Sequence, residues 1–378
     1  MLSHKSIVME IILNVLIFCI VLFLYLHIYF HLKTSDDLEI YEIDQPSKVK
    51  LEEICDLRQP VIFDFANERL LDSCKRQTIV DTYGAFDVKI RNVKNHISDE
   101  EELYVPISFT SAKKAMKEDT EEKYLVENNA DFLEETGMIK SFRYNDSFLR
   151  PYMVSNCSYD YLAGSNGTCT PFRYDLNYRN YYLVTEGTVK IKLAPPRSDK
   201  YLYTYKDYEN FEFRSPVNAW NVQQQYRPDF DKIKCLEVVV KKGQIIFIPA
   251  FWWNTMRFED DASVCAFKYK TYMNTVAMFP QLFMRFLQSH NVKRNIVSNK
   301  AQAGVATANA NDVSVSDINV VSNTVSNTVS HTNTSSNAVS NTVSNTVSNT
   351  VSNTVPNAAT TDIDKREETS SIDSLPIA

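Results

Sequence analysis

Residues 11–32, IILNVLIFCIVLFLYLHIYFHL, form an almost unbroken apolar run near the start of the 378-residue chain. At about 1.5 Å per residue, a helix of this length spans the roughly 30 Å hydrocarbon core of a bilayer. Asn14, His27 and His31 interrupt this run. We therefore predict a membrane anchor at 11–32, after a short flank at 1–10.

A cleaved signal peptide is the alternative interpretation of this segment. The apolar part of a signal peptide is usually about 7–15 residues long and ends at a small-residue cleavage site, and the sequence has neither feature. Lys5 precedes the run and Lys33 follows it, so the flanking positive charges orient the helix only weakly. We expect a single-pass protein with a cytoplasmic amino terminus and its bulk in a lumen or outside.

Charge and short motifs constrain the partners of the chain. The formal net charge is −7 and basic residues do not cluster, which argues against nucleic acid as a partner. Asn145, Asn156 and Asn166 each begin a glycosylation acceptor motif, although chance motifs are expected in a chain so rich in Asn, Ser and Thr. The six cysteines outside the anchor are compatible with disulfides or with buried free thiols, and they contain no CxxC pair typical of zinc sites.

Composition divides the rest of the chain into three parts. Residues 33–50 are polar and acidic and are predicted to form a stalk. Residues 51–295 contain enough apolar residues for one domain with a sizeable core. Residues 296–378 largely repeat Val-Ser-Asn-Thr, which buries too little to offset the entropy of ordering, so we predict a disordered low-complexity tail.

Hydrophobic periodicity predicts a mainly β domain with flanking helices. From Thr170 onward, runs such as TVKIKLAPP and CLEVVVKKGQIIFIP read as strands separated by short turns, which suggests a sandwich or barrel. Residues 111–128 and 131–138 fit helices better, and 280–294 forms a closing helix. Its apolar stripe favours a core contact over an oligomer interface.

Two stretches carry a resemblance to a known family. TPFRYDLNYRNYYLVTEGTVKIKLAPP at 170–196 and VVVKKGQIIFIPAFWWNTM at 238–256 resemble the cupin-like and JmjC-type 2-oxoglutarate oxygenases, as does LRQPVIF at 57–63. The resemblance covers about residues 51–275 and implies a double-stranded β-helix. The Asn-rich, repeat-tailed style also resembles JmjC-like proteins of giant viruses, which decides nothing about mechanism.

The resemblance implies a metal site that this sequence does not preserve. In the family, a His-x-Asp pair and a distant His hold iron(II), and a lysine often binds the far carboxylate of 2-oxoglutarate. The first histidine falls on Arg173, the carboxylate on Asp175, the second histidine on Asn254 and the lysine on Val189. The remaining pocket positions are Thr170, Asn180, Tyr182, Trp252 and Trp253. None of the six histidines lies between residues 97 and 289, so no shift in register restores two histidine ligands in the barrel.

Arg173 and Asp175 share one face of the predicted strand, because residues i and i+2 point the same way. We therefore predict a buried Arg173–Asp175 ion pair in place of the metal, with an ionised Asp175 and a hydrogen bond from Asn254. The same cationic fork and its aromatic surroundings could bind a small anion or a glycan. Ordinary core packing of these aromatic residues is the alternative.

These observations leave three functional hypotheses open. The first is a membrane-anchored, non-catalytic cupin/JmjC-like protein, without cofactor, that binds a small ligand or a protein partner or serves in assembly. The second is an active iron(II)- and 2-oxoglutarate-dependent hydroxylase or demethylase with atypical metal ligation. The third is a purely structural component of a surface or virion membrane. Protease and glycosidase sites have no support, since none of the histidines lies between residues 97 and 289 and a Ser/His/Asp or Cys/His arrangement therefore cannot be built within the barrel.

Overall fold

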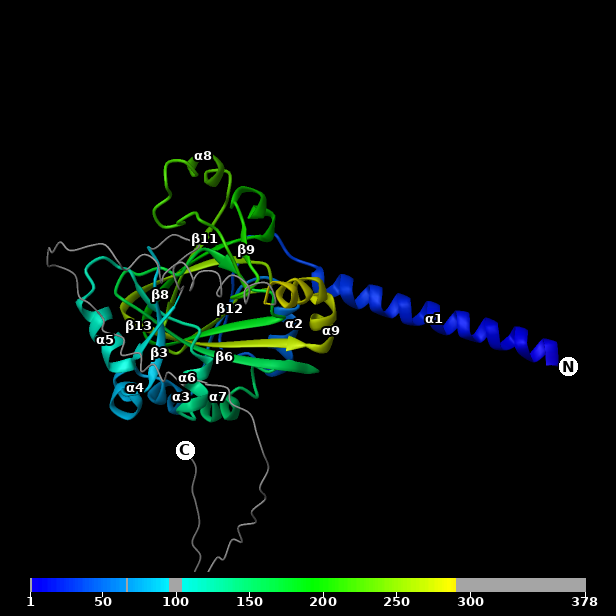
Figure 1. Cartoon of the computed structure of the whole chain (residues 1–378), viewed down its shortest axis with the longest axis horizontal. Coiled ribbons are helices and arrows are strands. Elements are labelled where there is room, and N and C mark those ends of the chain that lie inside the picture. Colours follow the sequence, from blue (N-terminus) through cyan, green and yellow to red (C-terminus); the bar gives the residue numbers. More distant parts are fainter. Residues whose placement is uncertain (1, 66, 95–103, 290–378) are drawn as a thin grey trace, which may run out of the picture. The chain divides into compact units, whose positions relative to one another are not determined.

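The computed structural model describes residues 2–65, 67–94 and 104–289 (Figure 1). The predicted tail at 296–378 and the last part of the closing helix lie outside the described residues. The helices are α1 (Leu2–Leu32), α2 (Lys48–Cys55), α3 (Glu68–Ser73), α4 (Arg76–Tyr83), α5 (Phe109–Glu118), α6 (Ala130–Glu135), α7 (Ile139–Asn145), the 3₁₀ helix η1 (Pro196–Tyr201), α8 (Arg227–Phe230) and α9 (Tyr272–Ala277).

The strands are connected by hydrogen bonds into one network. They are β1 (Tyr41–Ile43), β2 (Val61–Asp64), β3 (Asp87–Asn92), β4 (Val105–Ser108), β5 (Tyr124–Val126), β6 (Val154–Gly164), β7 (Arg173–Tyr174), β8 (Arg179–Ala194), β9 (Tyr205–Asp207), β10 (Glu212–Arg214), β11 (Leu236–Lys241), β12 (Gln244–Phe247) and β13 (Trp253–Thr271).

Two long strands give the domain its barrel form. The first half of β8 pairs with β12 and its second half pairs with β11. Likewise, β13 pairs with β7 near its start and with β6 along its second half. Each long strand therefore passes from one sheet to the other, as a double-stranded β-helix requires. Gly187 marks the bend in β8, where φ is +67° and an added Cβ would lie 2.6 Å from the backbone oxygen of Asp260.

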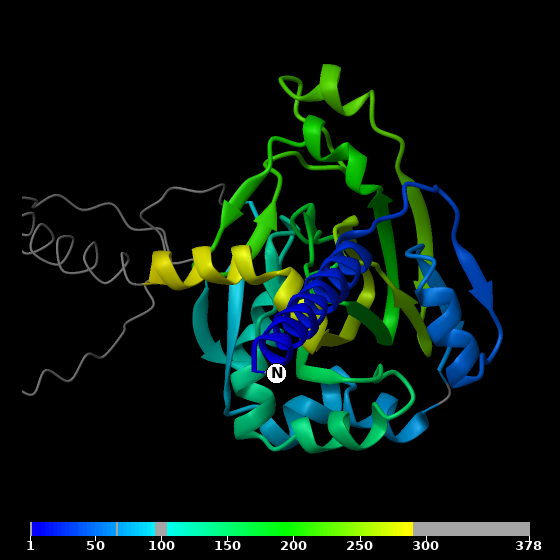
Figure 2. The same cartoon turned by 90° about the vertical axis from the view of Figure 1, so that its right-hand side faces the viewer.

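Alternating residues of the long strands divide the core into two layers. Between the sheets, the buried side chains include Val184, Val189, Ile191, Met256 and Phe258. On the outer side of the β8–β13 sheet, a second cluster joins Tyr181, Leu183 and Phe267 to side chains from the helices. Helices α3 to α7 lie together on one side of the barrel (Figures 1 and 2), and their apolar residues complete this second cluster.

Most predicted elements are present, with three corrections. The stalk predicted at 33–50 contains β1, which pairs in parallel with β2, so the folded sheet begins before residue 51. The helix predicted at 111–128 ends at Glu118, and Tyr124–Val126 instead form β5 against β3 and β6. The stripe of the helix at 279–289 is not core, because Phe283 is 47% exposed and Leu287 is 43% exposed.

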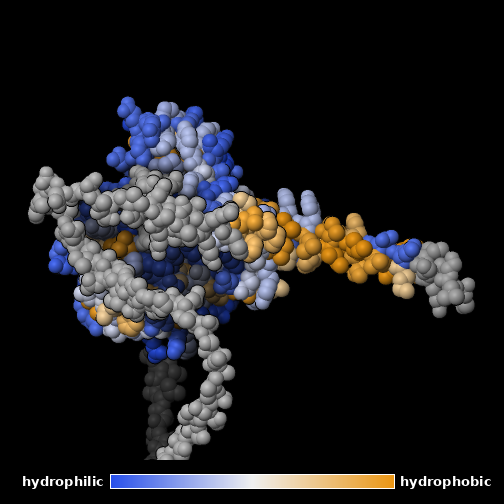
Figure 3. Space-filling view, in the orientation of Figure 1, coloured by the Kyte–Doolittle hydropathy of each residue, from blue (hydrophilic) through white to orange (hydrophobic). Residues whose placement is uncertain are grey.

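The amino-terminal helix is long and apolar enough to cross a membrane. Within its segment from Val8 to Leu32, an 18-residue window has a mean hydropathy of 2.8 and contains no buried residue (Figure 3). Nearer the domain, His31 is buried. A signal sequence near an amino terminus can also be long and apolar enough to meet this criterion. The end of this helix contacts the domain: Ile28 packs against a cluster that includes Ala277 and Met278, and a ring nitrogen of His31 lies 3.3 Å from the Thr271 hydroxyl.

The predicted modification and disulfide sites are distributed over the domain. Asn156 and Asn166 are exposed, whereas the half-buried Asn145 accepts a hydrogen bond from Asn67. All seven cysteines lie in the part of the chain that the structure describes, and each is a free thiol there. Cys55, Cys74 and Cys265 are buried, which fits the alternative of buried free thiols.

Candidate functional site

Short strands at the mouth of the barrel position the residues that replace the family's metal ligands. Arg173 opens β7, where it pairs with Asn254 on β13 and with Arg214 on β10. Asp175 follows β7 directly, and its carbonyl accepts a hydrogen bond from the Phe251 amide. The fold therefore brings Arg173, Asp175 and Asn254 to neighbouring backbone positions.

Arg173 forms ion pairs with two carboxylates that were not predicted from the sequence. Its Nη2 lies 2.6 Å from Oε2 of Glu127, and its Nη1 lies 3.0 Å from Oε1 of Glu212. Glu127 follows β5 and Glu212 begins β10, and both side chains are buried. The predicted direct Arg173–Asp175 pair is wrong, because the guanidinium is already held by these two carboxylates and Asp175 has another cation.

Lys268 is the cation that neutralises Asp175. Its Nζ lies 2.8 Å from Oδ1 of Asp175, and the Tyr182 hydroxyl donates a hydrogen bond of 2.7 Å to Oδ2. Burial by itself raises the pKa of Asp175, but the charges of Lys268 and Arg173 outweigh it and hold the pKa below its usual value. Asp175 is therefore ionised, as predicted, although mainly through Lys268.

Asn254 does not complete this network. It is only 2% exposed, and its Nδ2 donates to the carbonyl of Trp252, two residues earlier, at 3.2 Å. The predicted hydrogen bond to the Arg173–Asp175 region is therefore replaced by a local one. This local hydrogen bond satisfies the buried amide donor of Asn254. Arg173 and Asp175 are therefore paired with other side chains.

The other predicted pocket residues mostly serve the core. Thr170 accepts a hydrogen bond from the Met256 amide, and Asn180 donates to the carbonyl of Ile248. Val189 is fully buried between the sheets, where the resemblance implied a lysine for 2-oxoglutarate. Trp252 is buried between the sheets too, whereas Trp253 packs in a separate cluster with Phe172. Of the predicted pocket set, Tyr182 alone forms a hydrogen bond with the Asp175 side chain in the described residues.

A second layer of charges surrounds Arg173. Nη1 of Arg91 on β3 lies 2.8 Å from Glu127 and 3.1 Å from Glu212, and Nη1 of Arg214 lies 2.9 Å from Glu212. We call Arg91, Glu127, Arg173, Glu212 and Arg214 the arginine network. Burial by itself raises the pKa of Glu127, but the guanidinium groups of Arg173 and Arg91 outweigh it and lower the pKa to about 2.

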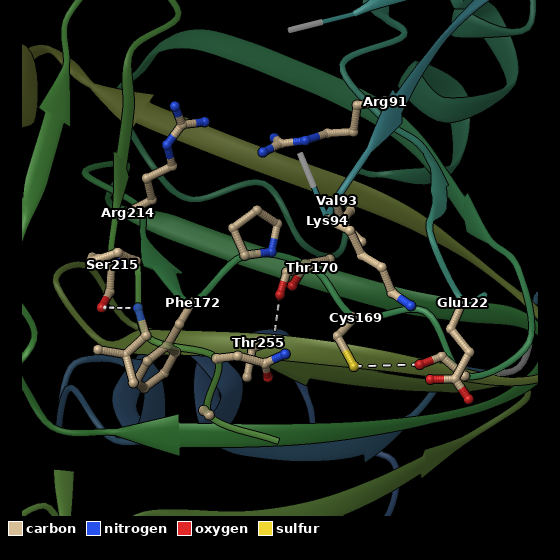
Figure 4. Close-up of a pocket in the computed structure, with 16 residues that line it drawn as sticks. Arg91, Val93, Lys94, Glu122, Cys169, Thr170, Phe172, Arg214, Ser215 and Thr255 are labelled. Carbon is tan, nitrogen blue, oxygen red and sulfur yellow. Dashed lines mark hydrogen bonds between the residues drawn. The ribbon is translucent and has the colours of Figure 1, made fainter. Parts of the chain in front are cut away.

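A cavity of about 170 Å³ opens beside the arginine network (Figure 4). Arg91 and Arg214 extend toward one another at one side of it, and Lys94 and Glu122 lie at another. Its remaining walls include Cys169, Thr170, Phe172, Ser215, Val217 and Thr255. The cationic fork that faces open space is thus made by Arg91 and Arg214 rather than by Arg173, which does not line this cavity.

Sequence signals existed for only some of these residues. Lys268 is a charged residue in the apolar strand SVCAFKYK, with the same parity as the buried Val264 and Ala266, so its inward orientation was predictable. Glu127, Glu212, Arg91 and Arg214 come from segments that carry no motif, and only the tertiary fold brings them together.

The side chains at the expected metal position do not fit iron(II). Arg173 and Asn254 replace the two histidines, and an ammonium and a hydroxyl occupy both oxygens of the carboxylate. Within residues 2–65, 67–94 and 104–289, no group of three His, Cys, Asp or Glu side chains is arranged to hold a metal ion. A guanidinium offers donors only and cannot act as a ligand.

Comparisons with known proteins agree with the barrel. The model of a family described as a cupin-like domain matches residues 46–269. HSPB1-associated protein 1 of Rattus norvegicus and of Homo sapiens is 30% identical over 102 residues, which cover 27% of this chain and 21% of each relative. JmjC domain-containing protein D of Dictyostelium discoideum is 29% identical over 94 residues, covering 25% of this chain and 21% of that protein. The chain thus matches about a fifth of the length of these relatives.

The arginine network predicts a specific response to acid. Because the pKa of Glu127 is lower in the folded than in the unfolded state, its contribution to stability is complete above about pH 4.5 and is lost as the pH falls toward about 2. We expect Glu127→Gln to lower the free energy of unfolding at pH 7 by about 3–5 kcal/mol, since it leaves buried guanidinium groups without a counter-charge. The variant should also show a flatter pH dependence between pH 4.5 and pH 2, measured by urea unfolding.

Glu135→Gln is the matched control, because Glu135 is exposed on α6. We expect this control to remain within about 0.5 kcal/mol of the parent protein at pH 7 and to keep the parent's slope in acid. Equal behaviour of the two variants would contradict the electrostatic role of Glu127.

Proposed function

We propose that this chain, which belongs to the cupin-like domain family, is a membrane-anchored binding or assembly protein that does not carry out iron- and 2-oxoglutarate-dependent oxidation. One observation carries this proposal: the ammonium of Lys268 and the hydroxyl of Tyr182 engage both oxygens of Asp175. Asp175 is the one carboxylate retained from the family's ligand pattern, and it already has a counter-charge.

Electrostatics explains why this arrangement opposes a metal ion. A divalent cation at Asp175 would approach the charges of Lys268 and Arg173 in a buried site, where repulsion between like charges is poorly screened. If the ion displaced Lys268, the ammonium would lose its partner, and burial of an unpaired charge costs several kcal/mol. The same ion pair that keeps Asp175 ionised therefore competes with iron.

An active iron(II)- and 2-oxoglutarate-dependent hydroxylase or demethylase is the alternative function. Family membership favours it, as do the retained Asp175, Thr170 and Asn180. In such an enzyme, iron would supply the oxidising centre, and this chain would offer only one carboxylate of the usual ligand set. The buried Val189 would also leave the far carboxylate of 2-oxoglutarate without the usual lysine.

A titration with iron(II) and 2-oxoglutarate tests the proposal. We expect the full-length protein, purified anaerobically in detergent, to retain less than about 0.1 iron per chain after gel filtration, because Lys268 neutralises the remaining ligand. We also expect no succinate to form from 2-oxoglutarate above the level of a buffer that contains iron alone. Stoichiometric iron together with succinate formation would establish the alternative function.

Names of relatives and the character of the surface suggest what is bound. The rat and human relatives are named for association with HSPB1, which favours a protein partner for this chain as well. A glycan or a small anion is a second class of ligand, because a cationic cavity lies beside the arginine network. A purely structural role in a membrane or virion surface would need no ligand at all.

The apolar surface near the end of α1 supports the membrane part of the proposal. Ile28 of α1 packs with Ala277 and Met278, so a bilayer that holds α1 must lie close to the helix at 279–289. That helix exposes large apolar side chains, with Phe279 64% exposed and Phe283 47% exposed. We expect this face to rest at the membrane surface, in the single-pass orientation that the flanking charges favour.

Fluorescence quenching tests this placement. In proteoliposomes that contain brominated lipids, the emission added by a Phe283→Trp substitution should be quenched, because the new indole would lie within the acyl-chain boundary. Lys114→Trp is the control, since Lys114 is exposed on α5, on the other side of the domain from α9 (Figure 1). Equal quenching of the two variants, or none of either, would contradict the placement.

A further inference from the structure

The arginine network contains more positive than negative charge. Among the residues that the structure describes, the guanidinium groups of Arg91, Arg173 and Arg214 form ion pairs only with Glu127 and Glu212, so three positive charges face two negative charges there. All five side chains are at most 15% exposed. A buried charge without a counter-ion is unfavourable, which suggests that one anion is missing from this cluster.

The neighbouring acidic side chains do not supply that charge. Asp175 is paired with Lys268. The carboxylate of Asp160 accepts hydrogen bonds from the backbone amides of Asn128 and Asn129, and burial raises its pKa. Neither residue forms an ion pair with Arg91 or Arg214 in the described chain. Glu122, which lines the cavity, has Arg257 as its ion-pair partner. Among the described residues, the positive surplus therefore lies beside the cavity.

Two buried donors belong to side chains that line this cavity and lack partners among the described residues. Nε of Arg91 and Nε of Arg214 are inaccessible and form no hydrogen bond within the described chain, and the two side chains are 5% and 9% exposed. Most buried polar groups in folded proteins are paired, so two unsatisfied guanidinium nitrogens in side chains that line one cavity point to a ligand. Guanidinium groups favour planar or tetrahedral oxyanions, because their donors match the spacing of the oxygens.

The other polar groups of the cavity are already occupied. The Ser215 hydroxyl donates to the carbonyl of Leu202 and accepts a hydrogen bond from the Val217 amide. The Thr255 hydroxyl donates to the carbonyl of Thr170 (Figure 4) and accepts a hydrogen bond from Trp220. These groups shape the walls, and the available positive charge comes from Arg91, Arg214 and Lys94.

We propose that this cavity binds one small oxyanion, a carboxylate or a phosphate group, between Arg91 and Arg214 with Lys94 at the rim. Thr255 faces the cavity and alternates along β13 with Asn254 and Met256, so the site is separate from the space between the sheets. The apolar side chains of Phe172 and Val217 leave room for a short apolar portion of the ligand. Glu122 opposes a second negative charge near Lys94.

This inference names a ligand class for the binding role and rests on the function proposed above. Its readout is anion affinity, which is measured without iron or 2-oxoglutarate. A barrel that proves catalytic and a cavity that fails to bind anions are therefore separate results.

Calorimetric titration of the full-length protein in detergent provides the test. Inorganic phosphate and acetate are titrated separately at constant ionic strength maintained with chloride, so the two sources of an oxyanion are distinguished. We expect one site per chain for at least one of them. Arg214→Gln should weaken binding at least tenfold, because it removes a charge-assisted donor.

Three milder variants keep the test decisive if Arg214→Gln does not fold. Lys94→Gln should weaken binding by about threefold, and Glu122→Gln should strengthen it by about threefold, as expected for partly exposed charges. Lys114→Gln, an exposed lysine on α5, should leave the affinity unchanged. The proposal is overturned if neither anion binds above the chloride background, or if the Lys94 and Glu122 variants match Lys114→Gln.

Discussion

The ion pairs around Arg173 and Asp175 determine what this barrel can do. Arg173 joins Glu127 to Glu212, and Lys268 holds Asp175. These contacts connect the segments at β5, β7, β10 and β13. The family resemblance places metal ligands at residues 173, 175 and 254, which lie on or next to β7 and β13. Buried ion pairs contribute little net stability, because desolvation offsets most of the attraction. Removing one partner is costly, however, so the network fixes one arrangement of the strands and disfavours others.

Strand parity made part of this site predictable. Lys268 has the same parity along β13 as the buried Val264 and Ala266, and the count of histidines ruled out two histidine ligands within the barrel. Neither strand parity nor the histidine count revealed that Arg173 would bind Glu127 and Glu212 in place of Asp175. Glu127 directly follows β5, in a segment that was predicted as a helix, and Glu212 comes from a segment without a motif. Their positions depend on tertiary contacts, which local periodicity does not encode.

Errors in the predicted elements have a similar physical origin. Residues 124–126 follow a helix with good propensity, but pairing with β3 and β6 makes them a strand. Residues 41–43 lie within a polar, acidic stretch of sequence, yet they form a strand that pairs in parallel with β2. In both cases, pairing with a neighbouring strand outweighs the local sequence preference for a helix or an irregular segment. The apolar stripe at 279–289 was assigned to the core, whereas its exposed side lies near the end of the membrane-spanning candidate.

Anomalous diffraction tests most directly whether protein cations occupy the position of the metal. Crystals of the full-length protein grown with manganese(II) and 2-oxoglutarate should show Lys268 Nζ within hydrogen-bonding distance of Asp175 and Arg173 between Glu127 and Glu212. They should give no anomalous peak at that position when data are collected at the manganese edge. A strong peak coordinated by Asp175, with Lys268 displaced, would contradict the account.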